Sequence, residues 1–215
     1  MSTRDTRERL LDAAEELFAK RGFDAASMRD ITSLADANLA SVNYHFGSKE
    51  ALLGEVIRRR AEGIVEDRER MLNLAVEAAG KHPPRARAVI EAFVYPMIST
   101  AREHPHFAAL MSRVHYEGLF HAVGKVFERT FQNSMVAFVT QLSKALPGIP
   151  AEEMRMRLVF TVGAFALIVK QNPMVNTLAK RKTDVCMEEV AGYLVDFCAA
   201  GMEAPPNKKR KGGRQ

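Results

Sequence analysis

The chain has 215 residues, 47% of them hydrophobic, and a formal net charge of +5. Its two cysteines are too few for a disulfide framework, and its longest apolar run, 158–169, is shorter than the roughly 20 residues that span a membrane. Because the N-terminus also has no signal-peptide pattern, the composition predicts a soluble cytoplasmic protein without a membrane partner.

Helical periodicity begins near the N-terminus. Apolar residues follow an i, i+3, i+4, i+7 pattern from Leu10 to Phe18, and Gly22 ends this first helix. Ser27 is a favourable N-cap for a short second helix, with Asp30 at the acidic position of a capping box. We expect the apolar face of this second helix to be formed by Ile31, Leu34 and Ala35.

A third and a fourth helix follow directly. Asn38 is expected to cap a third helix that runs to about Phe46, and Ser48 a long fourth helix over 49–79. At about 100° per residue, Leu39, Val42 and Phe46 fall on one side of the third helix. The opposite side is small, polar or aromatic and free of acids; it holds Ala40, Ser41, Tyr44 and His45.

Two short helices joined by a short turn form the pattern of a helix-turn-helix, whose second helix enters the major groove of DNA. The acid-free side of the third helix can approach a groove closely and offer hydroxyl and imidazole donors to base edges. Lys49 lies in the first turn of the next helix, where backbone N–H groups also favour a phosphate.

The segment 5–53 resembles the DNA-binding domain of the TetR family, and YHFGSKEALL (44–53) is similar to that family's most diagnostic stretch. The resemblance implies that Ser27 and Arg29 lie near the phosphate backbone of DNA and that Lys49 binds a phosphate. It also implies that one side of the third helix faces the DNA groove, with Ala40, Ser41, Tyr44 and His45. Two positions depart from the family pattern. Asp36 stands where the turn usually has Gly, and Asn43 replaces a common aromatic residue that contacts phosphate.

Beyond residue 53 the resemblance extends only to helix order and length. It implies an all-α fold of about nine helices, with a three-helix DNA-binding domain (1–48) and a helical effector-binding and dimerisation domain (49–204). The implied function is a repressor, not an enzyme, that binds a palindromic double-stranded DNA operator as a homodimer. A small-molecule effector would release it, and no cofactor or metal is implied.

The second half of the chain begins after a break at 81–84. The pattern predicts five further helices over 85–103, 106–117, 119–146, 151–171 and 184–202. Pro96 lies inside the first of these and is expected to kink it.

The effector is suggested by a second resemblance. The stretches NLASVNYHFGSKEAL (38–52) and FCAAGM (197–202) resemble a TetR subgroup that includes fatty-acid-responsive regulators. We therefore expect an apolar or amphipathic ligand, either a fatty acid or its coenzyme A thioester, with a planar aromatic drug as the alternative. Apolar, basic and aromatic side chains of the fifth to seventh helices are the candidate pocket residues: Met97, Arg102, Phe107, Met111, Arg113, His115, Tyr116 and Phe120.

The segment 158–165 is apolar nearly all round, so a helix there must be covered on every side. One explanation is a four-helix seam between two subunits, formed by the eighth and ninth helices. Its predicted residues are Phe160, Phe165, Leu194 and Phe197. The alternative is a helix buried entirely within its own chain.

Four histidines, His104, His106, His115 and His121, suggest a metal site, but none of them has the i, i+4 spacing that places two imidazoles on one face of a helix. We interpret them as surface or capping residues, with His104 at a helix–helix corner. Two other functions remain open at this point: an enzyme on a helical scaffold, and a non-specific architectural DNA-binding protein.

The positive charge is concentrated at the C-terminal end. Residues 207–215 hold five Lys and Arg and no acid, whereas the first fifty residues hold seven basic and nine acidic side chains. Bulk charge therefore does not predict DNA binding by the N-terminal region. We expect 205–215 to be a disordered tail that serves as a non-specific DNA tether or as a solubilising end.

Overall fold

A computed structural model describes residues 3–169 and 187–207. Over these residues the chain forms nine α-helices and no strand, which confirms the predicted all-α class. The helices are α1 (Thr3–Arg21), α2 (Met28–Leu34), α3 (Leu39–Phe46), α4 (Lys49–Ala79), α5 (Ala86–Glu103), α6 (Pro105–Tyr116), α7 (Phe120–Ala145), α8 (Ala151–Val169) and α10 (Met187–Glu203).

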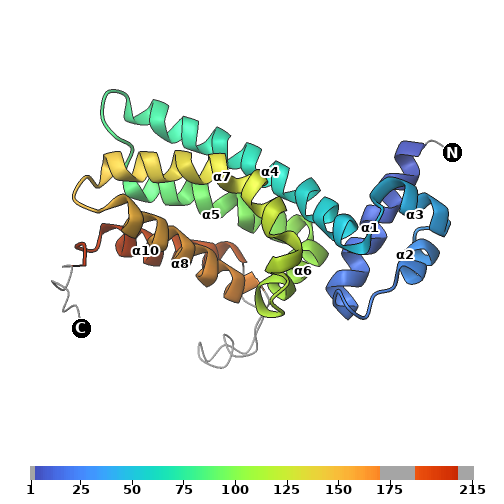
Figure 1. Cartoon of the computed structure of the whole chain (residues 1–215). Coiled ribbons are helices and arrows are strands. Elements are labelled where there is room, and N and C mark those ends of the chain that lie inside the picture. The colour runs from blue at the N-terminus through green and yellow to red at the C-terminus, as the bar shows by residue number, and fades with distance from the viewer. Residues whose placement is uncertain (1–2, 170–186, 208–215) are drawn as a thin grey trace, which may run out of the picture.

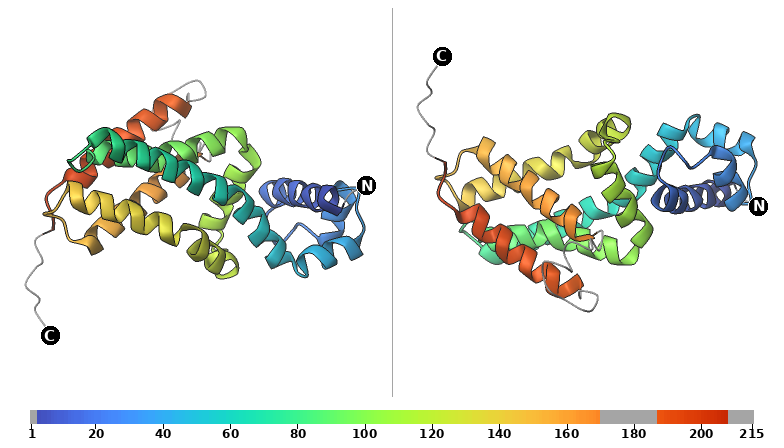
Figure 2. Two further views of the ribbon diagram at one scale, coloured as in Figure 1. Left: turned by 90° about the horizontal axis from the view of Figure 1, so that it is seen from above. Right: turned by 90° about the horizontal axis from the view of Figure 1, so that it is seen from below.

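The first three helices form a small group at one end of an elongated molecule (Figure 1). The long helix α4 leads out of this group and runs along α5 and α7 of a larger bundle. Helices α8 and α10 lie side by side on the side of that bundle away from α4 (Figure 2). The part that the sequence predicts to bind DNA and the part that it predicts to bind the effector therefore lie at opposite ends of the molecule, and α4 runs from one to the other.

The small N-terminal core is built by the predicted stripe of α1. Leu10, Phe18, Ile31 and Val42 are completely buried in it. Apolar burial of this kind stabilises a fold by roughly 25 cal/mol per Å² removed from water. The predicted apolar faces were wrong at two positions next to the turn between α2 and α3, since Leu34 and Leu39 are exposed.

The larger bundle has a separate aromatic centre. Phe93 of α5 and Phe138 of α7 are completely buried, and their ring centroids lie 5.1 Å apart in an edge-to-face arrangement. Pro96 lies inside α5, as predicted, and is buried. His104 connects α5 to α6, which confirms the predicted helix–helix corner.

The beginning of the C-terminal tail differs from the prediction. Arg157 of α8 donates hydrogen bonds to the carbonyl oxygens of Gly201, Met202, Ala204 and Pro205 at 2.6–3.2 Å. Glu153 accepts from the backbone N–H of Asn207 at 3.2 Å. Residues 205–207 are thus held against α8 because Arg157 satisfies carbonyls that the end of α10 leaves free; the basic residues 208–215 lie outside the described part of the chain.

Candidate nucleic-acid interface

Helix α2 begins with the predicted capping box. The Ser27 hydroxyl accepts a hydrogen bond from the backbone N–H of Asp30 at 3.1 Å, and the Asp30 carboxylate accepts from the backbone N–H of Ser27 at 3.1 Å. The hydrogen bonds from Ser27, followed by the charge of Arg21, lower the pKa of Asp30. Both ends of this reciprocal pair are therefore satisfied, which fixes where α2 starts.

The turn after α2 places a non-glycine residue in the left-handed region. Asp36 has a φ of 47°. The backbone N–H groups of Asp36 and Ala37 donate to the carbonyls of Ser33 and Thr32, which is the complete Schellman pattern of a helix C-terminus. Aspartate tolerates this conformation better than most side chains, so the turn forms without the usual glycine, as expected.

Arg9 of α1 supports the same turn. Its Nη1 donates to the carbonyl oxygens of Ala35 at 2.7 Å and Asp36 at 3.0 Å, and it lies 3.6 Å from an Asp36 carboxylate oxygen. A guanidinium on the last carbonyls of a helix also interacts favourably with the helix dipole. The relative position of α2 and α3 thus depends on a residue more than twenty positions upstream, which the sequence analysis did not single out.

Helix α3 begins at Asn38, as predicted. The Asn38 side-chain oxygen accepts from the backbone N–H of Ser41 at 2.7 Å and from the Ser41 hydroxyl at 3.0 Å. The helix ends at Gly47, which has a φ of 73°. The Ser41 hydroxyl is therefore already hydrogen-bonded within the protein.

The outward face of α3 consists of Ala40, Asn43 and Tyr44, which are all exposed. The Tyr44 side chain is 81% exposed, and its ring makes an edge contact with His45. Ser41 and His45 are only partly exposed and flank this face. Val42 and Phe46 are buried, as expected from the predicted orientation of α3. In the structure, the centre of the outward face lies closer to Asn43 than we predicted.

Two basic side chains lie near this face. Arg29 is exposed at the start of α2. Lys49, at the start of α4, donates to the carbonyl oxygen of Asp24 at 3.2 Å, and its ammonium lies 4.6 Å from the centroid of the Phe23 ring. Ser48 caps α4 by accepting from the N–H of Ala51 at 3.1 Å, as predicted. A cation and a helix N-terminus therefore stand together at the edge of the α3 face.

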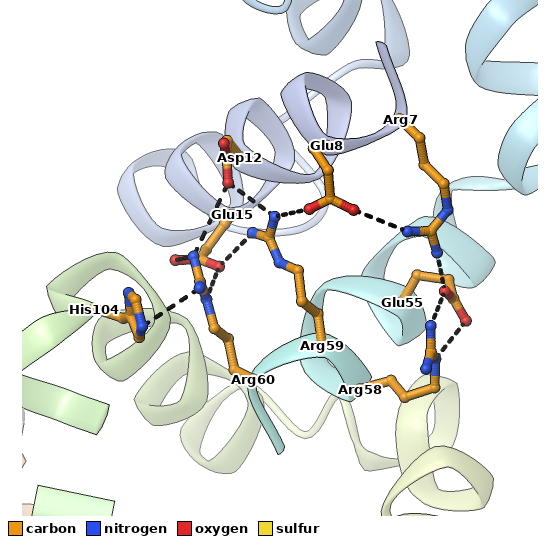
Figure 3. A network of polar contacts seen from close by, with 9 residues as sticks. All are labelled: Arg7, Glu8, Asp12, Glu15, Glu55, Arg58, Arg59, Arg60 and His104. Atoms are coloured by element: carbon orange, nitrogen blue, oxygen red, sulfur yellow. Dashed lines mark hydrogen bonds and ion pairs between the residues drawn. The ribbon is translucent and has the colours of Figure 1, made fainter. Parts of the chain in front are cut away.

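A network of charged side chains joins α1 to α4 (Figure 3). The buried carboxylate of Glu15 pairs with Arg59 at 3.0 Å and with Arg60 at 2.9 Å. Arg59 also reaches Glu8 at 3.1 Å and Asp12 at 2.9 Å on the same face of α1. Two arginines of α4 are thus held by three carboxylates of α1.

The same network extends in both directions. Arg7 of α1 pairs with Glu55 of α4, whose pKa is lowered mainly by its hydrogen bonds from Arg58. At the other end, Arg60 contacts the ring of His104 at 3.4 Å, at the corner between α5 and α6. Burial and the charge of Arg60 lower the pKa of His104. The charges therefore connect the N-terminal helices to the bundle through α4.

Arg113, which we predicted as an effector residue, lies at a second junction instead. Its guanidinium donates to the carbonyl oxygens of Ala19 at 2.8 Å and Lys20 at 3.3 Å, at the end of α1, and pairs with Glu117 at 2.5 Å. The free carbonyls of a helix C-terminus attract such a donor. This residue ties α6 to the end of α1, and each of its three guanidinium nitrogens already donates a hydrogen bond within the protein.

The other predicted effector residues do not form one group. Met97 and Phe107 are buried in the core, and Met111 packs partly against it. Arg102 is exposed and pairs with Glu188 at 2.7 Å, while His115 and Phe120 are exposed at the turn from α6 to α7. The side chain of Tyr116 lies outside what the structure describes.

The predicted dimer residues differ in exposure. Phe160 is 65% exposed and Phe197 is 73% exposed. Phe165 is partly buried against the core, and Leu194 is buried inside its own subunit, in a helix that packs against α5 and α8. Three other apolar side chains of these two helices are exposed as well, and we call the set the apolar patch of α8 and α10: Met156, Val159, Phe160, Tyr193 and Phe197.

Within residues 3–169 and 187–207, no group of three or more His, Cys, Asp or Glu side chains is arranged to hold a metal ion. No helix in this part of the chain is both long and apolar enough to cross a membrane.

Family models match both parts of the chain. Residues 10–56 match the model described as bacterial regulatory proteins, tetR family. Residues 87–201 match the model described as tetracyclin repressor-like, C-terminal domain.

Individual relatives are consistent with these matches. The chain is 26% identical over 162 residues to the HTH-type transcriptional repressor KstR of Rhodococcus jostii, covering 66% of this chain and 76% of the relative. It is 31% identical over 114 residues to the transcriptional regulator UidR of Escherichia coli, covering 53% and 52%. The structure of the fatty acid degradation regulator FadR from Bacillus halodurans aligns with a TM-score of 0.68 at 13% identity, covering 91% and 95% of the two chains.

Proposed function

Since the chain belongs to the TetR family of bacterial regulatory proteins, whose members are transcriptional regulators rather than enzymes, we propose that it is an effector-controlled repressor. It would bind a palindromic operator as a homodimer and leave the operator when a small molecule enters the C-terminal bundle. The observation that carries this proposal is the exposed, acid-free face of α3, held in a complete helix-turn-helix.

The contacts with DNA would divide into two kinds. Ala40 is small enough to let the backbone of α3 approach the groove, while Tyr44 and His45 reach base edges or the thymine methyl group. Asn43 stands on the same exposed face and adds an amide that can accept from or donate to a base. Ser27, Arg29, Ser41 and Lys49 surround this face and would contact phosphate or sugar.

The homodimer is supported by the apolar patch of α8 and α10, defined above by Met156, Val159, Phe160, Tyr193 and Phe197. Exposed apolar patches of contiguous side chains in soluble proteins commonly mark contacts with a partner. A two-fold axis through such a patch would pair α8 and α10 with their copies in a four-helix seam. The two α3 helices would then face half-sites whose centres lie about 34–36 Å apart, the spacing of successive major grooves.

Release by an effector requires a mechanical link between the bundle and α3. Helix α4 belongs to both parts, and the Glu15, Arg59 and Arg60 pairs bind it to α1. Arg113 ties α6 to the end of the same helix α1. A ligand with a higher affinity for a dimer conformation in which the two α3 helices are wrongly spaced for the operator would shift the population towards that conformation. The size of the shift is limited by the difference between its affinities for the two conformations.

A fatty acid or its coenzyme A thioester is the effector class that we favour. The sequences of 38–52 and 197–202 resemble those of fatty-acid-responsive regulators. One similar solved structure is named as a regulator of fatty acid degradation. A planar aromatic compound is the second candidate, because phenylalanine and methionine side chains adapt to either shape.

The proposal is tested by footprinting the purified full-length protein on the intergenic DNA beside its own gene. We expect protection of one inverted repeat, and fluorescence anisotropy with that repeat should give a preference over unrelated DNA of about a thousandfold or more. An equal affinity for all sequences, with a steep dependence on salt, would instead support the architectural DNA-binding alternative.

A further inference from the structure

Arg68 is a buried cation in the middle of the bundle. It belongs to α4, and only 3% of its surface is exposed. Its Nε donates to the carbonyl oxygen of Phe93 at 3.1 Å, and its guanidinium lies 3.8 Å from the centroid of the Phe93 ring and 5.7 Å from that of Phe131. No carboxylate in the described part of the chain pairs with it, which is unusual for an arginine at this depth.

This placement is energetically unfavourable for the protein alone. Burying a charge without a counter-charge is strongly unfavourable, because the ion loses its hydration and gains no partner of opposite charge. Burial lowers the pKa of Arg68 to about 9, so the side chain remains a cation at neutral pH. The contacts with the aromatic rings offset a part of this cost but provide no acceptor for the terminal N–H groups.

A structural role explains only one of its donors. Pro96 of α5 has no N–H to donate to the carbonyl of Ala92, and the Nε of Arg68 donates to the next carbonyl, that of Phe93. A single neutral donor would be sufficient for that purpose. The terminal nitrogens, Nη1 and Nη2, form a planar fork that fits the two oxygens of a carboxylate.

A row of aromatic side chains on α7 leads towards this cation. Phe120 is 45% exposed at the start of the helix; its ring centroid lies 5.4 Å from that of Phe127, which lies 5.6 Å from that of Phe131. The ring of Phe131 is in turn one of the two aromatic rings near the guanidinium of Arg68. Positions 120, 127 and 131 share one face of α7, so the rings connect the exposed end of the helix with the buried guanidinium.

A second buried polar group lies on the same face. Ser134 comes one turn after Phe131 and is 1% exposed, and its hydroxyl has no hydrogen-bond partner. Orphaned buried hydroxyls are rare in proteins, because such a group loses its hydrogen bonds to water and gains none in return. Phe131 therefore has near its ring an arginine without a carboxylate partner among the described residues, and one turn further along α7 a buried hydroxyl without a hydrogen-bond partner.

We propose that Arg68 binds the carboxylate of an apolar carboxylic acid, whose hydrocarbon part lies along the aromatic row of α7. This inference rests on the proposed effector-controlled function and specifies its ligand as a free acid. A thioester has only a neutral carbonyl at this position, and among the described residues Arg68 is the only buried lysine or arginine that could meet its phosphates. Arg102 and Arg113 are unsuitable as the anchor, because a carboxylate and main-chain carbonyls already occupy them.

The experiment uses the full-length protein and measures binding directly, by calorimetry and by the shift of the thermal unfolding midpoint. The ligands are decanoate and hexadecanoate, the corresponding alcohols, and hexadecanoyl-coenzyme A. We expect saturable binding of at least one acid, and binding of its alcohol that is weaker by about tenfold or more, since hydrogen bonds to charged groups are the strong ones. If no acid binds, or if an alcohol or the thioester binds as well as the acid, the proposal is wrong.

Two variants and one control locate the site. Arg68→Gln should weaken binding of the acid by about tenfold to a hundredfold. Arg70→Gln removes an exposed arginine two residues further along α4, which pairs only with Asp67 among the described residues, and it should leave the affinity unchanged. Equal affinity in the wild type and Arg68→Gln would overturn the assignment.

Ser134→Ala gives a second test of the site in case the Arg68→Gln variant does not fold. Removing an orphaned hydroxyl should leave the protein without ligand as stable as before or slightly more stable, yet weaken binding of the acid. Unchanged affinity in Ser134→Ala, together with an unfolded Arg68→Gln, would count against the site. Operator binding is measured on the same samples without ligand, so a failure of the repressor proposal is seen separately from a failure of the ligand.

Discussion

At the scale of single residues, Asp36 occupies the left-handed position in the turn that joins α2 to α3. Its φ of 47° is sterically unfavourable for a side chain, and the left-handed region costs an ordinary residue about 1–2 kcal/mol. Asp36→Val should therefore lower the free energy of unfolding by about that amount or more, because branching at Cβ makes the conformation worse. Asp36→Gly should equal or exceed the wild type, as measured by urea denaturation. Equal stability of the valine and glycine variants would show that the turn rearranges.

Tyr44 and Lys49 are expected to contribute to binding in different ways. Tyr44→Ala should lower operator affinity by about 1–3 kcal/mol, with little effect on unrelated DNA, because the exposed ring has no role in the core. Lys49→Ala should weaken all sequences about equally and reduce the salt slope by about one unit. Anisotropy titrations at several salt concentrations measure both effects. An unchanged operator affinity in Tyr44→Ala would mean that α3 meets DNA with a different face.

At the scale of helices, local sequence signals were sufficient for the ends of the DNA-binding motif. Ser27, Asn38 and Ser48 each cap the helix that they were expected to cap, because a side-chain oxygen next to the first free N–H groups acts within one turn. The same is true of the left-handed Asp36. Interactions of this range are visible in a single sequence.

The tertiary roles of the arginines could not be predicted in this way. Arg9, Arg68 and Arg113 are ordinary members of charged or amphipathic helices, and their partners lie 26, 25 and 94 positions away in the chain. A guanidinium can pack its stem on apolar surface and still reach a distant carbonyl, so periodicity does not distinguish these residues from solvated ones. For the same reason the contacts of Arg113 with the end of α1 and the burial of Leu194 within its own subunit were not predicted.

The attachment of α1 to α4 gives a prediction at this scale. Glu15→Gln removes the charge that lies between Arg59 and Arg60, so we expect the free energy of unfolding to fall by about 1–3 kcal/mol. The matched control is Glu62→Gln, an exposed carboxylate of α4 paired with Arg58, which should change stability by less than about 0.5 kcal/mol. Chemical denaturation measures the free energy of unfolding of both variants. Equal effects would mean that the network in Figure 3 stabilises the protein no more than exposed ion pairs do.

At the scale of the whole molecule, the two α3 helices of a repressor can meet two half-sites only if the subunits are held together. The apolar patch of α8 and α10 is the surface that we expect to hold them. Phe197 and Phe160 are its most exposed aromatic residues, whereas Phe165 also packs on its own core. A charge at Phe165 would therefore disturb the fold and the interface together, and the two exposed positions give the cleaner test.

Phe197→Glu and Phe160→Glu should each convert the dimer into a folded monomer. In the isolated subunit the new carboxylate remains in water, but in a two-fold interface it would be buried without a partner in both copies, at a cost of several kcal/mol. Val136→Glu places the same charge on an exposed apolar position of α7 and should remain dimeric. Sedimentation equilibrium gives the mass, and circular dichroism verifies the helices. The monomeric variants should also lose most of their operator affinity, since each would bind only one half-site. If both phenylalanine variants stay dimeric, the subunits associate through a different surface.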